Sequence, residues 1–491
     1  MQGQNMKFVI RALGIALLTF GCWSVVASAQ TPFTAGTWTK IRNVPPAGVG
    51  HIQLLTDGSV LALNSGCSAT GIWYRLVPDR TGSYVHGTWH SVGALPSGYN
   101  PLYFASAVLP NGKFIVMGGE YNACNKEWTT LGALYTPSSN TWVPITAPPG
   151  WTTIGDAQGV VLPNGKFMLA NCCTTDEALL SLSGTTATWT PTGTGKADIN
   201  DEEGWTLLPN GKVLTVDANN GASPSTSEIY TPSTGAWTAG PTMSVQLEDP
   251  SSHELGPAVL RPDGTVFYAG ATTNNAIYHS STNTWTTAPS FGGSLDIADG
   301  PGSLLPDGNV LLDTSPGVFG TGTKFFEWDG TALHAVPGPP NAAVDSSYYG
   351  NMVVLPTGQI LFTDFSSDVE VYTPRGSACS GCAPAITSVA SRLTHGTHNN
   401  VITGRQFSGK SQGAAYGDDN QNATNFPLVR ITDSTGKVVY CRTHNFNSGV
   451  STGTSVVSAQ FDIPSTIALG AGSLQVVTNG IASAAVAVNI I

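Results

Sequence analysis

A short turn that ends in glycine recurs seven times along the chain, each time after a hydrophobic stretch. Three copies read Leu-Pro-Asn-Gly, and the other four are close variants. The turn glycines are Gly58, Gly112, Gly165, Gly211, Gly264, Gly308 and Gly358. Asn-Gly and Asp-Gly pairs favour two-residue hairpin turns, in which both positions take positive φ. The repeat therefore predicts a regular series of β-hairpins.

The spacing of these turns predicts the architecture. The first and last glycines are 300 residues apart over six intervals, so the mean period is 50 residues. Short hairpins at this period are typical of a kelch-type β-propeller, here with seven blades. Only 10% of the residues are charged, and the 57 glycines and 32 prolines fit an all-β chain with many turns.

Tryptophan forms a second series with the same count. One precedes each turn: Trp38, Trp89, Trp142, Trp189, Trp237, Trp285 and Trp328. Several follow a Tyr-x-Pro segment, but Tyr372-Thr373-Pro374 has no tryptophan after it and Trp38 has no such segment before it. We therefore expect the two ends of the propeller to complete one blade, which closes the ring and removes exposed sheet edges. The series indicates blade packing and carries no functional information.

The N-terminus predicts export. Lys7 and Arg11 precede an apolar run over residues 12–20 and Ala27-Ser28-Ala29, which indicates a signal peptide over residues 1–29. The run is short for a membrane anchor, and no other segment could span a bilayer. Removing the peptide changes the net charge from -11 to about −13, which disfavours nucleic acid and anionic membranes as partners. We expect a secreted protein, extracellular or periplasmic.

Seven cysteines remain after the predicted cleavage: Cys67, Cys124, Cys172, Cys173, Cys379, Cys382 and Cys441. Export makes disulfides plausible. A local bridge between Cys379 and Cys382 would stiffen the linker after the propeller. The alternative is a CxxC metal or redox motif, but no second CxxC completes a zinc site. The first four cysteines should lie toward one face of the propeller, where some can pair.

After Pro374 the turn and tryptophan series stop. The following segment has strand-like runs at residues 428–432, 437–441, 456–463, 473–477 and 484–490, separated by Gly, Asn and Ser. It predicts an immunoglobulin-like β-sandwich. The expected organisation is a signal peptide at 1–29, a propeller at 36–376 and a C-terminal sandwich at 384–491.

A kelch propeller followed by a sandwich with Arg442-Thr443-His444-Asn445 and Phe461-Asp462-Ile463-Pro464 resembles the galactose oxidase and glyoxal oxidase family. The run LQVVTNGIAS at residues 474–483 adds to this resemblance, which extends from about Thr37 to the C-terminus. It implies one copper ion on the propeller axis. The ligands would be a tyrosine thioether-linked to a cysteine, an axial tyrosine followed by a histidine, and a histidine from the C-terminal domain. Such a metal–radical pair oxidises an alcohol or aldehyde and reduces oxygen to peroxide.

Three of these ligands have counterparts in the sequence. Tyr103 matches the cross-linked tyrosine, Tyr348 the axial tyrosine, and His444 the C-terminal histidine. Two elements are missing, because the cysteine position holds Val49 and the histidine position after Tyr348 holds Tyr349. Loss of the thioether makes a tyrosyl radical harder to reach, and a phenol with a pKa of about 10 is a weaker copper ligand than imidazole. A metal site here would be an altered one.

Equivalent positions in successive blades predict a different site. The residues nine before the turn glycines are Val49, Tyr103, Asp156, Glu202, Leu255, Asp299 and Tyr349, and they should form a ring at one mouth of the central channel. Converging carboxylates from Asp156, Glu202 and Asp299 favour a hard cation such as Ca²⁺ or hydroxyl-rich ligands such as sugars. Asp201 and Glu254 are one step away. The alternative is a solvated acidic rim that binds nothing.

Other motifs indicate less. His51 and His253 are expected to be structural, and the polar loop at residues 416–425 is interpreted as a surface turn, with a calcium site as the alternative. No Gly-rich phosphate loop, HExxH or GxSxG is present, so nucleotide chemistry and the common hydrolases have no support.

Three functions follow from the sequence. The missing cysteine and histidine favour a secreted propeller that binds carbohydrate or cell-surface material at its mouth, without radical copper chemistry. The second hypothesis is a copper-dependent alcohol or aldehyde oxidase with an altered site. The third is a structural or adhesive extracellular protein. Copper and calcium are the two candidate ions.

Overall fold

The computed structural model describes residues 33–66 and 71–491. Each of the seven predicted turns joins two antiparallel strands, as between β2 (Val49–Leu54) and β3 (Val60–Asn64). The amide of every turn glycine donates to a carbonyl three residues earlier; for Gly58 and Leu55 the two atoms are 3.0 Å apart. The predicted series of hairpins is therefore confirmed.

The type of turn differs from the expectation. The seven turn glycines have φ between 75° and 95°, but the residue before each of them is not in the left-handed region. Six of these preceding residues are Asp or Asn, and their side chains accept a hydrogen bond from the amide two residues further on. The N–H of Lys113, for example, lies 3.0 Å from Asn111 Oδ1. The expectation of two positive φ angles was wrong, because only glycine takes that backbone and Asp or Asn stabilises the turn through its side chain.

In the part of the chain that the structure describes, the hairpins lie in seven antiparallel sheets, one for each hairpin, and we call the four strands around each hairpin blades 1 to 7. Blade 1 contains β2, β3, β4 (Trp73–Val77) and β5 (Thr88–Ser91). Blade 2 contains β7 (Ala105–Val108), β8 (Phe114–Met117), β11 (Gly132–Thr136) and β12 (Thr141–Pro144). Blade 3 contains β13 (Gly159–Val161), β14 (Phe167–Ala170), β15 (Glu177–Ser183) and β16 (Thr186–Thr192). Blade 4 contains β17 (Thr206–Leu207), β18 (Val213–Val216), β19 (Ser227–Thr231) and β20 (Ala236–Ala239).

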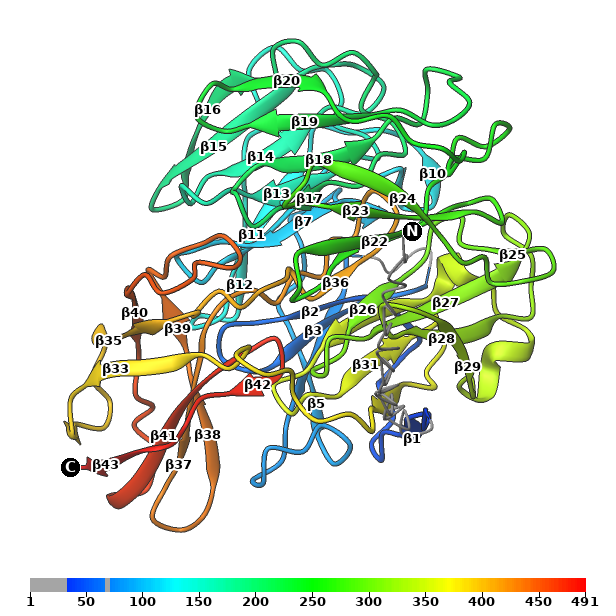
Figure 1. Cartoon of the computed structure of the whole chain (residues 1–491). Helices are drawn as coiled ribbons and strands as arrows, with labels where there is room; N and C mark the ends of the chain where they lie inside the picture. The colour runs from blue at the N-terminus through cyan, green and yellow to red at the C-terminus, as the bar shows by residue number, and fades with distance from the viewer. Residues whose placement is uncertain (1–32, 67–70) are drawn as a thin grey trace, which may run out of the picture. The chain divides into compact units, whose positions relative to one another are not determined.

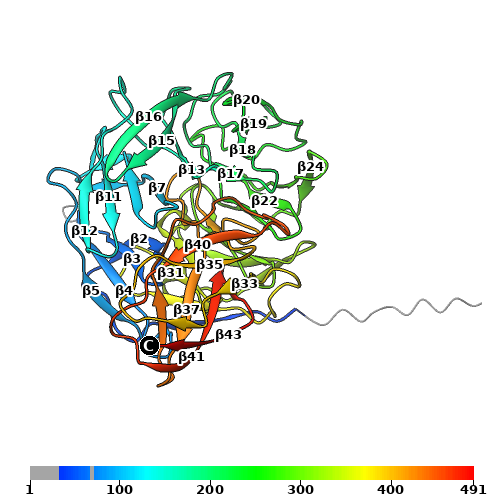
Figure 2. The ribbon, with the colours of Figure 1, turned by 90° about the vertical axis from the view of Figure 1, so that its left-hand side faces the viewer.

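Blade 5 contains β21 (Ala258–Leu260), β22 (Thr265–Ala269), β23 (Asn275–His279) and β24 (Thr284–Ala288). Blade 6 contains β26 (Gly302–Leu304), β27 (Val310–Pro316), β28 (Lys324–Trp328) and β29 (Leu333–Val336), with β25 (Leu295–Asp296) paired to β27. Blade 7 contains β30 (Asn351–Val354), β31 (Ile360–Thr363), β32 (Glu370–Thr373) and β1 (Thr37–Lys40). The first strand of each blade lies innermost, as Figure 2 shows for β2, β7, β13 and β17. The inner strand β30 contacts both β2 and β26, which closes the ring.

Closure of the ring follows the prediction. β1, near the start of the chain, pairs antiparallel with β32, and Trp38 stands opposite Tyr372 with ring centroids 4.9 Å apart. Six of the seven series tryptophans lie in outermost strands, and Trp328 lies in β28. They pack within and between blades, as expected.

Short elements connect the blades. A small sheet at one end of blade 2 contains β6 (Pro101–Leu102), β9 (Tyr121–Asn122) and β10 (Asn125–Lys126). Two 3₁₀ turns, η1 (Pro340–Ala343) and η2 (Ser347–Tyr349), precede β30. No helix within the described residues has the length and apolar character needed to cross a membrane.

Two further sheets follow the propeller. One contains β33 (Ala385–Val389), β35 (Asn400–Arg405), β40 (Val457–Phe461) and β39 (Thr443–His444). The other contains β34 (Arg392–Leu393), β43 (Val486–Ile490), β41 (Gly470–Thr478), β37 (Leu428–Thr432), β38 (Val438–Cys441) and β42 (Ile481–Ala482). The five predicted strand runs coincide with β37, β38, β40, β41 and β43. The immunoglobulin-like topology and the domain boundaries stay predictions, because residues 35–491 form one compact unit.

We call the region that contains these two sheets the sandwich. One of its segments lies in the centre of the propeller. This channel segment, residues 411–425, contains β36 (Ala414–Ala415), which pairs with the inner strand β26 (Figure 1). Gln412 Oε1 accepts the Leu207 amide at 2.7 Å, Asn422 Nδ2 donates to the Met352 carbonyl at 2.9 Å, and Gln53 Nε2 donates to the Ala423 carbonyl at 3.0 Å. Inner strands of blades 1, 4, 6 and 7 therefore all hold the channel segment.

Two turn glycines provide a matched test of this packing. A Cβ at Gly58 would overlap the ring of Tyr440 in the sandwich, whereas at Gly165 the nearest atom is Pro110 Cγ at an ordinary 3.6 Å. Both glycines are left-handed, with φ of 75° and 82°. We expect Gly165→Ala to cost about 1 kcal/mol of unfolding free energy from backbone strain. Gly58→Ala should cost roughly 1–3 kcal/mol more from overpacking. Chemical denaturation measures both, and equal losses would show that the sandwich does not press on this turn.

Candidate functional site at the propeller mouth

The residues nine before the turn glycines lie where the chain enters each inner strand. Three of them share a left-handed backbone, with φ of 50° at Tyr103, 60° at Glu202 and 46° at Asp299. This conformation is uncommon for residues other than glycine, and it persists only where surrounding structure holds it. Its recurrence at one offset in three blades supports the predicted equivalence of these positions.

Six carboxylates gather at this end of the channel. The ligand oxygens of Asp156, Asp418 and Asp419 lie within 4.8 Å of one another, and so do those of Glu202, Glu254 and Asp299. We call the first three the inner triad and the second three the outer triad. The inner triad and Glu254 are buried, while Glu202 and Asp299 are half-buried. The structure thus brings together the predicted acids Asp156, Glu202 and Asp299 with Glu254, which the sequence placed one step from the ring. It also adds two acids that the sequence did not group with the ring, Asp418 and Asp419.

Those two additions correct one expectation. The loop around Asp418 and Asp419 was interpreted as a surface turn, but these side chains are only 2% and 1% exposed. The interpretation was wrong because the loop belongs to the channel segment. The amide of Asn420 donates to the Phe104 carbonyl at 3.2 Å, and Gly417 packs so closely on Asp299 that a Cβ would overlap its carboxylate. Of the sequence predictions, only the alternative of a calcium site in the loop at residues 416–425 gave Asp418 and Asp419 a functional role.

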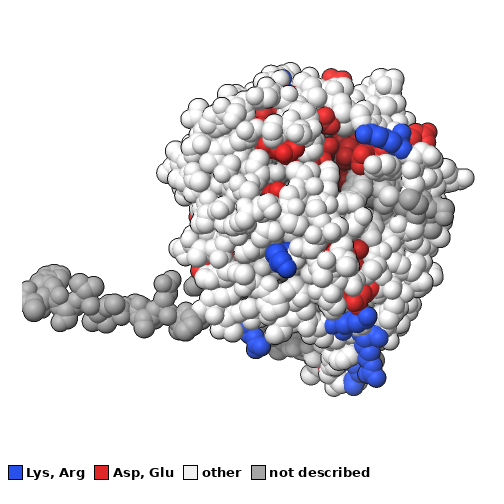
Figure 3. Space-filling model, turned by 90° about the vertical axis from the view of Figure 1, so that its right-hand side faces the viewer, with Lys and Arg blue, Asp and Glu red and all other residues white. Residues whose placement is uncertain are grey.

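The six acids lack a positive partner. None of the ion pairs in residues 33–66 and 71–491 includes any of them. Burial, followed by repulsion from neighbouring carboxylates, raises the pKa of Asp156, Glu202, Glu254, Asp299 and Asp419 well above the ordinary range. Burial also raises the pKa of Asp418 to about 7. Figure 3, which looks onto the face away from the sandwich, shows Asp and Glu side chains gathered in a hollow.

Aromatic rings form an arc beside the acids. Neighbouring ring centroids along the arc are 4.2 to 6.3 Å apart. In order, its members are Tyr121, Tyr103, Phe365, Tyr349, Tyr348 and Phe319. Phe319 is 40% exposed and the others are half-buried. The hydroxyl of Tyr416 donates to the Tyr348 carbonyl at 2.7 Å, which ties the channel segment to this arc.

The predicted residue His444 lies elsewhere. It is buried on β39, its Nε2 is 3.1 Å from Asp462 Oδ1, and it packs beside the turn at Gly112. Tyr103 is on the other side of β7 from that turn, so the length of this strand separates the two residues. The structure brings Tyr103, Tyr348 and Tyr349 together and leaves His444 out. The Thr443-His444 context correctly indicated a strand. It did not indicate where the His444 side chain lies relative to the channel.

These residues do not fit the copper–radical group that the resemblance implies. Val49 is buried in β2 where the cross-linking cysteine would stand, and the arc supplies phenols in place of imidazole. His51 is enclosed by Phe104, Phe114 and Trp73, and burial lowers its pKa to about 3. His253 Nδ1 lies 3.1 Å from the Ala218 carbonyl. The donor set at the mouth is therefore oxygen-rich, which suits hard cations better than copper.

The cysteines divide into two groups. Cys379 and Cys382 form the predicted disulfide, and Cys124 is also disulfide-bonded. Cys67 and the predicted signal peptide lie outside the described residues. Cys172 and Cys173 lie beside Asp201 at the rim of the acidic hollow, with sulfur–oxygen distances of 3.4 and 3.3 Å.

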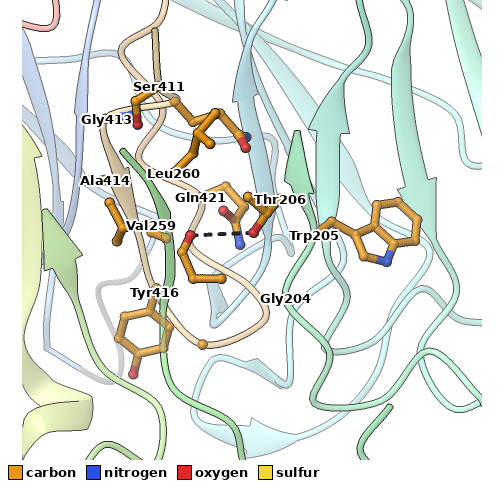
Figure 4. A pocket seen from close by; sticks show the side chains of 14 residues that line it. Gly204, Trp205, Thr206, Val259, Leu260, Ser411, Gly413, Ala414, Tyr416 and Gln421 are labelled. Atoms are coloured by element: carbon orange, nitrogen blue, oxygen red, sulfur yellow. Dashed lines mark hydrogen bonds between the residues drawn. The ribbon is translucent and has the colours of Figure 1, made fainter. Parts of the chain in front are cut away.

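Below the acids the channel is closed. A cavity of about 10 Å³ remains between the channel segment and the inner strands, lined by residues such as Thr206, Val259 and Gln421 (Figure 4). This is room for roughly one water molecule. Thr206 Oγ1 donates to the Ala258 carbonyl at 3.4 Å across neighbouring strands. A second cavity beside the channel segment, lined by residues such as Ser106 and Asn425, has about 20 Å³. Both spaces are too small for an organic ligand, so we expect a ligand to enter from the mouth.

Comparison with known proteins agrees with this fold. No family model matches the chain. It is similar to the Kelch-like protein terF of Aspergillus terreus, with 24% identity over 163 residues, which are 32% of this chain and 34% of that protein. The match thus spans about a third of the length of this curated relative.

Among solved structures, a fungal alcohol oxidase of the AA5 family in complex with copper aligns with a TM-score of 0.50 and 13% identity. The alignment covers 93% of this chain and 99% of that one. In fold, the chain is a galactose oxidase-like kelch protein. A streptogramin B lyase aligns with a TM-score of 0.49 and 8% identity, over 70% of this chain and 98% of that one. At these identities the likeness concerns the fold alone.

The environment of His444 gives a pH prediction. Burial alone would raise the pKa of Asp462, but hydrogen bonds from the Asn399 amide, His444 and Arg442 lower it to about 2. A depressed carboxyl pKa stabilises the fold above the unfolded value of about 4, and this contribution is lost as the pH falls toward 2. Asp462→Asn should therefore cost roughly 1–2 kcal/mol at pH 7. The difference from wild type should shrink as the pH falls from about 4 to about 2, as measured by chemical denaturation.

His444→Ala tests the same group from its other side. Because the imidazole supports Asp462, we expect a similar loss of stability and no change in the metal content of the purified protein. A metal bound by wild type and lost in this variant would instead restore His444 as a ligand.

Proposed function

We propose that this protein is an exported binding protein whose propeller mouth takes a hydroxyl-rich ligand of the carbohydrate class. The observation that carries the proposal is the position of Tyr103, in the aromatic arc, close to the half-buried carboxylate of Asp299, which clusters with Glu202 in the outer triad. Sites for small polar molecules combine aromatic walls with a few convergent polar groups. Sugars offer both matching surfaces, because hydroxyl groups project from a ring whose faces are largely C–H.

The arc is suited to stacking. Tyr348 and Tyr349 have centroids 4.2 Å apart with planes inclined by 47°, so they present an angled wall in place of a single flat plate. Tyrosine rings give large apolar contact area and keep a polar hydroxyl at the edge. Carboxyl groups of the outer triad then form hydrogen bonds with ligand hydroxyls. Because their pKa values are raised, these groups can donate as well as accept such bonds.

The other two hypotheses have less support. The copper oxidase hypothesis keeps Tyr103 and Tyr348 close to Tyr349. The predicted imidazole ligand, His444, lies instead beside Asp462 on β39. A purely structural or adhesive protein gives no reason to bury acids without positive partners, because such burial opposes folding. Export is supported by the predicted signal peptide and by the disulfide between Cys379 and Cys382, since disulfides persist in oxidising compartments.

A direct binding experiment tests the proposal. The mature protein is screened against an array of neutral and acidic oligosaccharides, and hits are measured by isothermal titration calorimetry. We expect Tyr349→Ala to weaken binding of any hit by at least tenfold, because it removes one face of the aromatic wall. Tyr349→Phe keeps the ring and should retain most of the affinity.

The outcome has two further controls. Asp299→Asn keeps the shape of the side chain and should weaken binding of the same ligand. Trp38→Phe, in β1, should leave binding unchanged. The proposal fails if no oligosaccharide binds, or if a ligand binds with equal affinity to wild type and Tyr349→Ala.

A further inference from the structure

Oxygen atoms of the inner triad are buried and have no hydrogen-bond partner among residues 33–66 and 71–491. Both Asp419 oxygens, Asp156 Oδ1 and Asp418 Oδ2 are in this condition, and so is the amide oxygen of the adjacent Asn420. Asp156, Asp418 and Asp419 are 8%, 2% and 1% exposed. A buried carboxylate without a partner is costly, because its charge loses the stabilisation that water provides.

The same protein contains a buried acidic group that is compensated. Asp198, Glu203 and Asp217 also place their oxygens within 4.8 Å of one another. There Lys196 enters the group, with its Nζ 2.9 Å from Glu203 and 2.6 Å from Glu228. The inner triad has three acids at the same spacing and no such lysine. The comparison indicates that positive charge at the mouth comes from outside the chain.

We propose that Asp156, Asp418 and Asp419 bind one divalent cation of the calcium class, which fixes the channel segment to blade 3. Asp156 comes from the propeller, and the two other ligands come from the sandwich, so the ion would join the two parts of the chain. This site is separate from the proposed carbohydrate contacts, which use the outer triad and the aromatic arc. It does not depend on them.

The oxygen atoms of the triad indicate which kind of ion it would bind. Calcium takes six to eight oxygen ligands in flexible geometry, and carboxylates, amide oxygens and backbone carbonyls are its usual donors. Magnesium demands near-octahedral geometry and retains several waters, for which a buried triad leaves little room. Zinc and copper favour nitrogen or sulfur. Among the described residues, the sulfur donors that cluster with an acid are Cys172 and Cys173, and their partner is Asp201 and no member of the triad.

The first experiment is a metal measurement on the full mature protein. After treatment with EGTA and gel filtration, the protein is titrated with CaCl₂ by calorimetry and its thermal unfolding is followed with and without calcium. We expect one calcium per chain and a rise in Tm of a few degrees when calcium is in large excess over its Kd. Magnesium at the same concentration should give a smaller rise.

Asp419→Asn and Asp176→Asn make a matched pair, because each removes one negative charge but Asp176 is exposed on the surface. Asp419→Asn should bind calcium at least a hundredfold more weakly and show no calcium-dependent rise in Tm. In EGTA at pH 8 it should unfold at a higher temperature than wild type, since it relieves repulsion within the triad. In saturating calcium that order should reverse. Asp176→Asn should behave as wild type in both conditions.

Three outcomes would overturn the proposal. They are absence of calcium binding by wild type, calcium binding that survives in Asp419→Asn, and retention of copper that depends on Tyr103 and is unaffected by Asp419→Asn. If Asp419→Asn does not fold, the wild-type comparison between EGTA and calcium still decides the question. Carbohydrate binding is measured on the same samples, so loss of calcium with retained sugar binding, or the converse, separates this site from the proposed function.

Discussion

Pairing of β1 with β32 holds the first and last blades together, and the geometry of the mouth depends on that contact. The residues at the mouth come from blades 2 to 7 and from the channel segment, so no single stretch of sequence contains the site. A closed ring fixes the inner strands at one radius and one height. Without closure the seven hairpins could still form, but Tyr103 of blade 2 and Tyr349 of blade 7 would have no fixed separation.

The mouth also shows a local conflict between folding and binding. Around Lys196 the buried carboxylates are neutralised by a cation of the chain itself, so this cluster has little need of an external ion. At the mouth it leaves six carboxylates without such a partner. Left-handed backbone at Glu202 and Asp299 adds to that expense. Sequence choices that oppose stability in one place are typical of residues retained for binding.

Much of the fold could be predicted because its determinants are local. A Leu-Pro-Asn-Gly turn or one of its variants specifies a hairpin within a few residues, and seven such turns at a mean period of 50 residues specify blades. The same period groups Asp156, Glu202 and Asp299 from the sequence alone. Asp418 and Asp419 could not be grouped with them, since they follow no repeat and reach the channel only through contacts with distant inner strands. His444 was misplaced for a related reason, because local context locates a strand in the sequence and not its position relative to the channel.

The channel segment has a consequence for the order in which the molecule is completed. Asp418 and Asp419 follow all seven blades in the chain, so during synthesis or translocation the ring can assemble before its centre is filled. N-terminal parts of a chain generally fold first. The propeller would then have an unfilled central channel until the channel segment has been synthesised and packs into it. A chain that ended before residue 411 would contain the strands of every blade but would lack Asp418 and Asp419. Its central channel would be open where the channel segment now fills it.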